Sequence, residues 1–489
     1  MKTFVTVCLL LLPIASQSRE RTSIPNSSSL LNHETGIQSL SIPSLNDWSD
    51  TPSVLTHSPD SIANFSSSDS EKDSLVLDFN HGGFYRKRHR PHVFVLSELD
   101  RARQVPYRES FAMMDFNRVT GYFLGLGSPG FGDIGAHDEI GTTGGFGYGF
   151  ADKRWEYRLG AEFRLPLSNL SKIEHDSGYR HNIYSPHTLA IGGEFHNITS
   201  TDDAWRAGRI ENAADAFFAR EDFRDYFKLA GWDGYLAYRP SRNYEMRLDW
   251  RSDHYQSLSQ EVFYGRWGGN KVLPPNPPIS EGHMNSLVFS SQHESVHTRS
   301  RETPNLFGDS ISIEQLAGMS SLFQIELGHM PGSDFGFNRY VFDSRKFSPI
   351  AHGISFDTRL LFEATTGDTL YQKWEFLGGP GSLPANYRKS LYGNRMLLLN
   401  TELRFSLAML SGVFHSPDIN LVVYNDLGKI GTAAQDEGIF KGFGFSGPSS
   451  ILYNVGVGIG WTNGIQVGAT WPTNVKDDPR VIFRLQRAF

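Results

Sequence analysis

The stretch WEYRLGAEFRL at residues 155–165 decides the fold, because its residues alternate in character at every step. Its odd positions are apolar or aromatic, and its even positions carry a carboxylate, a guanidinium group or glycine. Successive side chains of a β-strand point to opposite faces of the sheet, so the stretch predicts a strand with one apolar and one charged face. Its length and its charges of both signs are typical of a strand that crosses a bilayer at a tilt, with lipid on one side and a wet lumen on the other.

The same alternation recurs through most of the chain. We expect strands near 116–126, 143–152, 155–165, 186–198, 227–239, 243–253, 284–296, 318–330, 337–348, 354–365, 395–407, 419–428, 450–461, 464–471 and 480–489. Bacterial single-chain barrels have even strand numbers, so one further strand is expected near 89–97 or inside 256–283. The sequence therefore predicts an all-β fold, a closed antiparallel transmembrane β-barrel of about sixteen strands, with a helix in the loop at 202–224. A soluble β-sandwich is the alternative that alternation alone leaves open.

The start of the chain indicates export. Residues 1–18 contain an early lysine and a short apolar run, which is typical of a secretory signal peptide. The one cysteine, Cys8, lies inside that run, so the mature chain is expected to have no disulfide and no thiolate metal site. No other apolar run is long enough for a transmembrane helix, and the net charge of −7 argues against a dedicated nucleic-acid binder. The expected location is the outer membrane of a Gram-negative type of cell.

Composition divides the rest of the chain. Residues 19–74 are rich in serine, asparagine and proline, and we expect a disordered leader there. Residues 75–105 are expected to be a periplasmic junction segment. Its basic residues at 86–90 are either solvated or in contact with anionic lipid. Residues 106–489 are expected to form the barrel.

The last strand ends in an aromatic residue preceded by apolar residues on one face. These residues are Val481, Phe483, Leu485 and Phe489. Such an ending is typical of the signal by which outer-membrane barrels are recognised, so we expect the barrel-assembly machinery to bind it, and outer-membrane lipid to surround the finished barrel. An ordinary terminal strand is the alternative.

Three stretches carry a further signal. Residues 378–405 read GGPGSLPANYRKSLYGNRMLLLNTELRF, residues 424–428 read YNDLG, and residues 115–127 read DFNRVTGYFLGLG. They resemble, in turn, the sixth-loop signature, the next strand and the opening barrel strand of the BamA/TamA superfamily, the surface-antigen barrels. The resemblance implies an outer-membrane barrel with its long loop folded into the lumen. Superfamily members that insert or translocate proteins carry periplasmic POTRA domains before the barrel. Because most of the leader here is Ser-rich and is not expected to form such a domain, the chain resembles the barrel-only branch.

The resemblance also implies a lock, in which a loop arginine pairs inside the barrel with a strand glutamate and a strand aspartate. Glu402 and Asp426 match the two carboxylates. Residues 384–386, PAN, stand where the superfamily has its Arg-Gly-aromatic tripeptide, so Arg388 is the nearest candidate for the cation and Lys389 the second. Breaking such a buried pair is costly because solvent screening is weak. The alternative is that both carboxylates are hydrated in an open lumen.

The sequence gives little support for enzymatic chemistry. Residues 293–297, HESVH, match the zinc-protease pattern, but that pattern needs a helix and these residues continue an expected strand. We therefore expect no enzyme, no catalytic residue, no cofactor and no metal site. The expected function is outer-membrane biogenesis or transport across the outer membrane. A diffusion porin is the alternative, and a metalloprotease is a weaker one.

Overall fold

The structure is a computed structural model, and the residues it describes all lie in one compact unit, 69–489. They are residues 73–78, 83–88, 114–133, 140–167, 187–241, 243–267, 269–304, 308, 310–410, 419–444, 451–461, 465–473 and 478–485. The predicted signal peptide, Phe489 and nearly all of the predicted leader lie outside them. Where the leader and the junction segment were expected to meet, β1 (Asp73–Asp78) pairs antiparallel with β2 (Gly83–Arg88).

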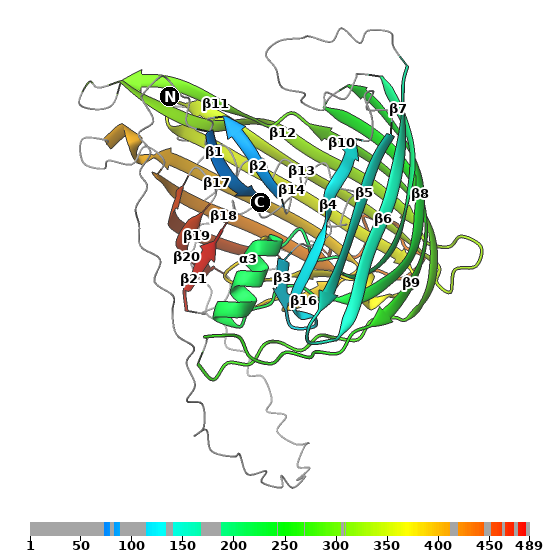
Figure 1. The fold of residues 1–489 in the computed structure, drawn as a ribbon. Helices are drawn as coiled ribbons and strands as arrows, with labels where there is room; N and C mark the ends of the chain where they lie inside the picture. The colour runs from blue at the N-terminus through cyan, green and yellow to red at the C-terminus, as the bar shows by residue number, and fades with distance from the viewer. Residues whose placement is uncertain are drawn as a thin grey trace, which may run out of the picture. The chain divides into compact units, whose positions relative to one another are not determined.

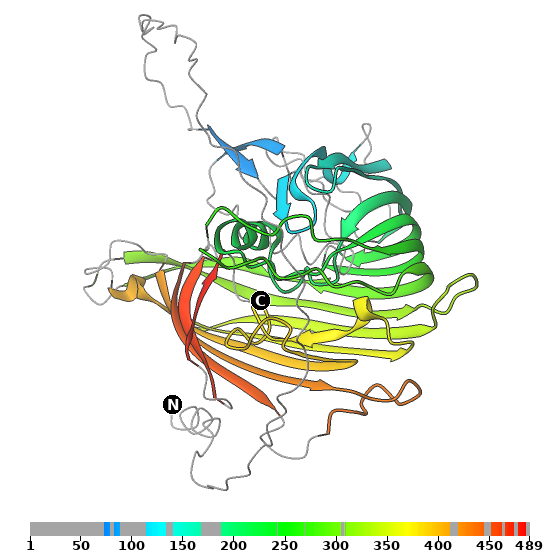
Figure 2. The ribbon, with the colours of Figure 1, turned by 90° about the horizontal axis from the view of Figure 1, so that it is seen from below.

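One antiparallel sheet contains most of the described strands, which confirms the all-β prediction. The strands are β3 (Met114–Asn117), β4 (Gly121–Asp133), β5 (Ile140–Gly149), β6 (Arg154–Pro166), β7 (Thr188–Ser200), β8 (Phe227–Ser241), β9 (Tyr244–Ser257), β10 (Gly282–Glu294), β11 (His297–Pro304), β12 (Ser310–Leu327), β13 (Phe337–Ala351), β14 (Ile354–Gly367), β17 (Arg395–Ser406), β18 (Ile419–Gly431), β19 (Leu452–Trp461), β20 (Gln466–Pro472) and β21 (Arg480–Arg484). Successive strands of this list pair with one another, except that β10 and β11 both pair with β12, and the sheet curves strongly (Figures 1 and 2). Within the described residues, no helix is long and apolar enough to span a membrane.

The strand expected near 116–126 is two strands, β3 and β4, joined by a tight turn. The Asn117 Oδ1 accepts hydrogen bonds from the backbone N–H groups of Val119 and Thr120, both at 2.9 Å. Gly121 follows with φ +61°, a left-handed conformation that glycine adopts without a Cβ penalty. The alternating pattern hid this side-chain-capped turn, because the residues on both sides of it are apolar.

This turn supplies the strand that was expected elsewhere. The described residues between β9 and β10 contain no strand, so the prediction of one inside 256–283 is wrong. The other expected position, 89–97, lies outside the described residues.

β10 and β11 occupy one place in the sheet. Both pair with β12, β10 along its second half and β11 along its first half. Ser295 and Val296 separate them, and the Ser295 carbonyl would lie 2.4 Å from a Cβ added at Gly318. The pairing keeps the same register on both sides, because Glu294 faces Ser320 and His297 faces Ala317, so no extra residue is inserted, and the absent Cβ of Gly318 makes room for the Ser295 carbonyl. It also shows that the HESVH segment is extended, as its composition predicted.

The two faces of the sheet differ as the alternation predicts. In β6 the buried side chains are Glu156, Glu162 and Arg164, whereas Trp155, Tyr157 and Leu159 are between 40% and 59% exposed. Other strands repeat this outer apolar face with Leu124, Phe146, Phe195, Trp232, Leu248, Phe356, Val423 and Ile459. Soluble monomers rarely expose apolar patches of such extent, so this face indicates contact with lipid or another apolar partner.

Two loops pack against the inner, charged face of the sheet. The 201–226 loop contains α3 (Arg209–Ala214) and the π-helix η1 (Asp215–Ala219), so the helix expected over 202–224 is confirmed for its middle part. The 368–394 loop contains η2 (Tyr371–Lys373) and the short hairpin of β15 (Glu375–Leu377) and β16 (Leu391–Gly393). We call these two loops together the plug.

The plug has its own apolar contact with the sheet. Leu377 and Leu383 are fully buried and pack against side chains of β13, β14 and β17, namely Val341, Leu361, Met396 and Leu398. Burying two leucine side chains contributes about 3–6 kcal/mol before the cost of ordering the loop. The 368–394 loop is therefore packed on the wall of the sheet.

Candidate functional site

The loop that resembles the sixth-loop signature is shaped by its glycines. Gly378, Gly379 and Gly381 all have positive φ, at +107°, +89° and +72°. A Cβ on Gly381 would lie 2.2 Å from the backbone oxygen of Arg206 in the 201–226 loop. Only glycine permits this approach, so the two loops of the plug touch at a position that the sequence specifies.

Arg388 and Lys389 lie at the contact between the two loops, and their partners are in the 201–226 loop. The Arg388 Nη2 lies 2.8 Å from the Asp225 Oδ1, and its Nη1 donates to the Asp222 carbonyl. The Lys389 Nζ lies 2.5 Å from both the Asp203 Oδ2 and the Asp225 Oδ2. The two cations that the sequence proposed do hold the loop, although not on the expected carboxylates.

A third cation comes from the turn between β3 and β4. The Arg118 Nη2 lies 2.6 Å from the Asp225 Oδ1, and its Nη1 donates to the Asp222 carbonyl at 3.0 Å. The Tyr371 hydroxyl also donates to the Asp225 Oδ2, at 3.0 Å. We call Arg118, Arg388, Lys389, Asp203, Asp222 and Asp225 the lock. The Arg206 Nε also lies 2.9 Å from the Asp203 Oδ1, so each carboxylate of the lock has at least one cation beside it, as burial requires.

The lock shifts the acidity of its carboxylates. Burial raises the pKa of Asp225, but the charges of Lys389, Arg388 and Arg118 outweigh burial and hold that pKa well below its usual range. The pKa of Asp203 is lowered for the same reason. Burial raises it, but the charges of Lys389 and Arg206 outweigh burial. Both groups therefore remain charged at neutral pH.

Glu402 and Asp426 lie on the inner face, as expected, but Arg388 does not pair with them. The Glu402 Oε2 lies 2.7 Å from the Arg404 Nη2, and the Asp426 Oδ1 accepts from the Asn400 Nδ2 at 2.7 Å. The predicted pairing therefore needs correction. Arg404 on the same strand already pairs with Glu402, and Asn400 on the neighbouring strand donates to Asp426, while Arg388 turns toward the denser negative charge of the 201–226 loop.

A hydrogen bond connects β17 with the plug beside Asp426. The Asn400 Nδ2 also donates to the Ser382 carbonyl, at 2.9 Å. Neutral hydrogen bonds thus connect the predicted strand carboxylate with the loop, where an ion pair was expected.

A cavity separates Arg388 from Asp426. Its volume is about 660 Å³, and it is lined by both loops of the plug, by β18 and by β21. Asp215 lines it too, and burial, followed by the charge of Glu211, raises the pKa of Asp215 to about 8. At the edge of the cavity, Arg480 lies over the Tyr387 ring, 3.7 Å from its centroid.

The terminal strand bounds this cavity and carries the proposed assembly signal. Val481 is 81% exposed and Phe483 is 49% exposed, on the same face of β21, and Leu485 is half-buried. On the opposite face, the Arg484 Nε donates to the Glu211 Oε1 of α3. β21 therefore shows an apolar outer face and is tied to the plug on its inner face.

A second set of ion pairs attaches the plug to the wall, and sequence reasoning did not anticipate it. The Lys373 Nζ lies 3.2 Å from the Glu326 Oε2 of β12. The Arg339 Nε of β13 lies 3.2 Å from the Glu375 Oε1 of β15. Inward charges at alternate strand positions were visible in the sequence, but the loop residues that meet them were not.

No protein-family model matches the chain, and no curated protein matches it. Among solved structures, BamA from Haemophilus ducreyi lacking POTRA domains 1–3 is similar with a TM-score of 0.44 at 13% identity, over 76% of this chain and 67% of that chain. CdiB from Acinetobacter baumannii has a TM-score of 0.34 at 11% identity, over 76% and 57%. CdiB from Escherichia coli has a TM-score of 0.37 at 13% identity, over 76% and 61%. The chain thus spans between 57% and 67% of these three chains. Because these TM-scores are low, we draw the function from the chain's own residues.

Proposed function

We propose that this chain is an outer-membrane β-barrel of the BamA/TamA superfamily whose own plug keeps its lumen shut. In this proposal it serves outer-membrane biogenesis or transport across the outer membrane, and it is not an enzyme. Three features support the proposal: the outer apolar face, the inner charged face and the sixth-loop resemblance at 378–405. In this proposal residues 1–18 direct export, and the segment that includes the β1–β2 hairpin precedes the barrel at 106–489.

In the same proposal the sheet closes into a sixteen-stranded barrel, with β21 against β3. Two observations support closure. β21 and β3 are adjacent in the strand order, which has sixteen places when β10 and β11 count as one. The plug also spans from one terminal strand to the other, because α3 contacts Arg484 of β21 while the lock contacts Arg118 beside β3.

The lock is the main observation that supports a gated role for the barrel. Its ion pairs join the 201–226 loop, the 368–394 loop and the β3–β4 turn, and its charged groups are largely removed from solvent. A pore for free diffusion needs an open lumen, whereas a plug held by several buried ion pairs opposes steady solute flow. The lock therefore favours a gated role over the diffusion porin.

Conductance in a planar lipid bilayer tests this choice. We expect the wild-type chain to give small, unstable currents, and we expect Lys389→Met, which removes two ion pairs of the lock, to give larger ones. Lys346→Met, on β13 outside the lock, is the matched control and should behave as the wild type. Large, steady currents from the wild type would support the porin and contradict the proposal.

The location is tested separately. The full chain should fractionate with the outer membrane and should migrate differently on a gel before and after heating. Recovery of the folded chain from the soluble periplasm would contradict a membrane barrel of any function.

A further inference from the structure

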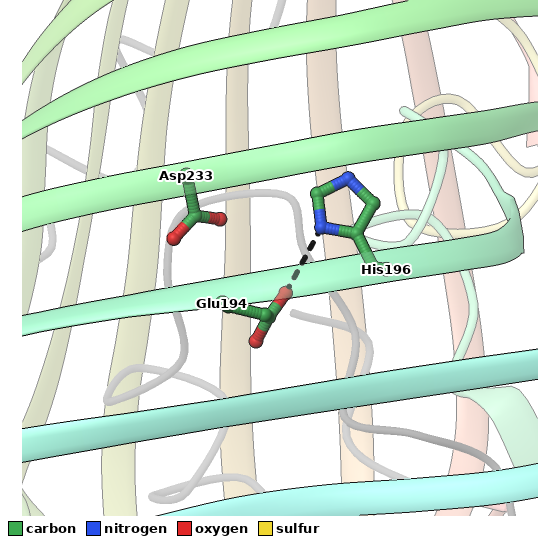
Figure 3. Close-up of side chains that lie close together, drawn as sticks. All are labelled: Glu194, His196 and Asp233. Atoms are coloured by element: carbon green, nitrogen blue, oxygen red, sulfur yellow. Dashed lines mark ion pairs between the residues drawn. The ribbon is translucent and has the colours of Figure 1, made fainter.

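A cluster of acidic and imidazole groups lies on the inner face, away from the plug. Glu194 and His196 stand two residues apart on β7, and Asp233 on β8 is the direct cross-strand partner of Glu194. All three side chains are buried, and they point toward one another (Figure 3). One ligand atom from each lies within 4.8 Å of the others, so the three groups converge on a single point.

The orientation of His196 is fixed from the far side. Its Nε2 lies 2.8 Å from the Asp253 Oδ1 on β9, and its Nδ1 lies 3.3 Å from the Glu194 Oε1. A neutral imidazole that donates its Nε2 proton to Asp253 presents the Nδ1 lone pair to a carboxylate oxygen. Two electron-rich atoms at that distance repel, so a cation belongs between them: either a proton or a metal ion.

We propose that Glu194, His196 and Asp233 form a binding site for a divalent transition-metal ion of the zinc type. The His196 Nδ1 and one carboxylate oxygen each from Glu194 and Asp233 are ligands that such ions prefer, with water as a fourth. Asp253 supplies the carboxylate that orients a metal-bound histidine through its other nitrogen.

The distances suit such an ion. Tetrahedral zinc with bonds of about 2.0–2.2 Å holds its ligand atoms about 3.3–3.6 Å apart. Glu194 and His196 already meet this separation, at 3.3 Å, and one oxygen of Asp233 lies within 4.8 Å of both ligand atoms. The Arg158 Nε lies 2.5 Å from the Glu194 Oε2, whereas the Oε1 is the oxygen that lies beside the His196 Nδ1.

Neighbouring guanidinium groups hold two of the carboxylates, since Arg158 binds Glu194 and Arg251 stands opposite Asp233 in the β8–β9 register. Bound zinc would cross-link β7 and β8, and through Asp253 also β9, in the wall of the sheet.

The site is tested by zinc titration of the full chain in detergent after treatment with a chelator. We expect one tight site per chain in isothermal calorimetry. His196→Gln should lose it, because a glutamine amide replaces the Nε2 donor to Asp253 but puts no ligand at the Nδ1 position. Asp233→Asn is a second variant of nearly equal shape, and Asp253→Asn should weaken binding by about 10–100-fold.

His297→Gln is the matched control, because it removes the second histidine of the HESVH segment and should leave zinc affinity unchanged. Heat-modifiable migration verifies that each variant is folded. A wild type without a one-to-one site would show that a proton, and no metal, lies between Glu194 and His196. Unchanged affinity in folded His196→Gln and Asp233→Asn, or loss of the site in His297→Gln, would overturn the assignment.

Discussion

The contact of Arg388 with Asp225 can be measured against the contact that the sequence proposed. Arg388→Ala removes one charge-assisted hydrogen bond to the Asp225 carboxylate and one to the Asp222 carbonyl. Hydrogen bonds to charged groups contribute about 1.5–3 kcal/mol each. Arg118 and Lys389 remain on Asp225, so the carboxylate is not stranded. The two bonds together set an upper limit of about 3–6 kcal/mol. Removal of Arg388 also relieves its repulsion by Arg118, so we expect a net loss of about 2–3 kcal/mol, below the roughly 3–5 kcal/mol for breaking an isolated buried pair.

That loss should be visible as movement of the plug. At 1.4 kcal/mol per factor of ten, it raises the population of the undocked plug about 30–150-fold. Single-channel recording should show longer and larger openings in Arg388→Ala, and thermal unfolding in detergent should begin at a lower temperature. Lys346→Met, outside the lock, should change neither measurement.

Two double-mutant cycles then identify the partner. Arg388→Ala combined with Asp225→Asn should show a coupling energy of about 1–3 kcal/mol, because the two side chains share an ion pair. Arg388→Ala combined with Glu402→Gln should be additive, because Glu402 pairs with Arg404. Coupling to Glu402 as large as coupling to Asp225 would refute the contacts described here, and so would unchanged conductance in Arg388→Ala.

Further predictions concern pH, the loops and assembly. The lowered pKa of Asp225 means that the lock stabilises the plug above the ordinary carboxyl pKa of about 4, so conductance should rise as the pH falls below that value; unchanged conductance down to pH 2 would contradict this. The pKa of Asp215 is raised to about 8, so ionising it costs stability as the pH rises toward that value; Asp215→Asn should melt like the wild type in acid and above it at pH 9, and equal melting at both would count against this. Gly381→Ala should separate the loops and raise conductance, whereas Gly438→Ala, which meets nothing within 4 Å, should not. Deletion of Phe489 should slow assembly in cells, and normal assembly would remove the terminal strand as the recognition element.

Much of the sheet could be predicted from the sequence. A strand whose two faces meet different surroundings needs apolar and polar residues at alternate positions, and this alternation is visible in the sequence. Most expected strands overlap observed ones, for example 155–165 with β6 and 227–239 with β8. The pattern failed where a turn interrupts it without changing composition. The Asn117 turn is specified by two hydrogen bonds to one side-chain oxygen, which a hydropathy pattern does not detect.

The site was predictable only in part, for a different reason. Arg388 and Lys389 could be singled out because the glycine-rich motif around them is local in sequence. Their partners lie more than 160 residues away in a loop whose acidic residues, such as Asp203 and Asp225, have the composition of any solvated segment. Only the fold of both loops shows that these carboxylates are buried and bound.

The attachments of the plug differ in kind, and this difference bears on which part of it can move. Leu377 and Leu383 are held by apolar packing on the wall, which gives no substitute contact in water. Arg388 and Lys389 are held by charges, which water can solvate once they separate. Opening should therefore begin at residues 384–390, where the 368–394 loop meets the 201–226 loop, while the segment around Leu377 stays on β13 and β14. A cavity of about 660 Å³ already lies beside those residues and against β21, so the freed segment has space there without unfolding. We therefore expect the lock to control access from the lumen to the terminal strand, while the packed leucines keep the rest of the 368–394 loop on the wall of the sheet.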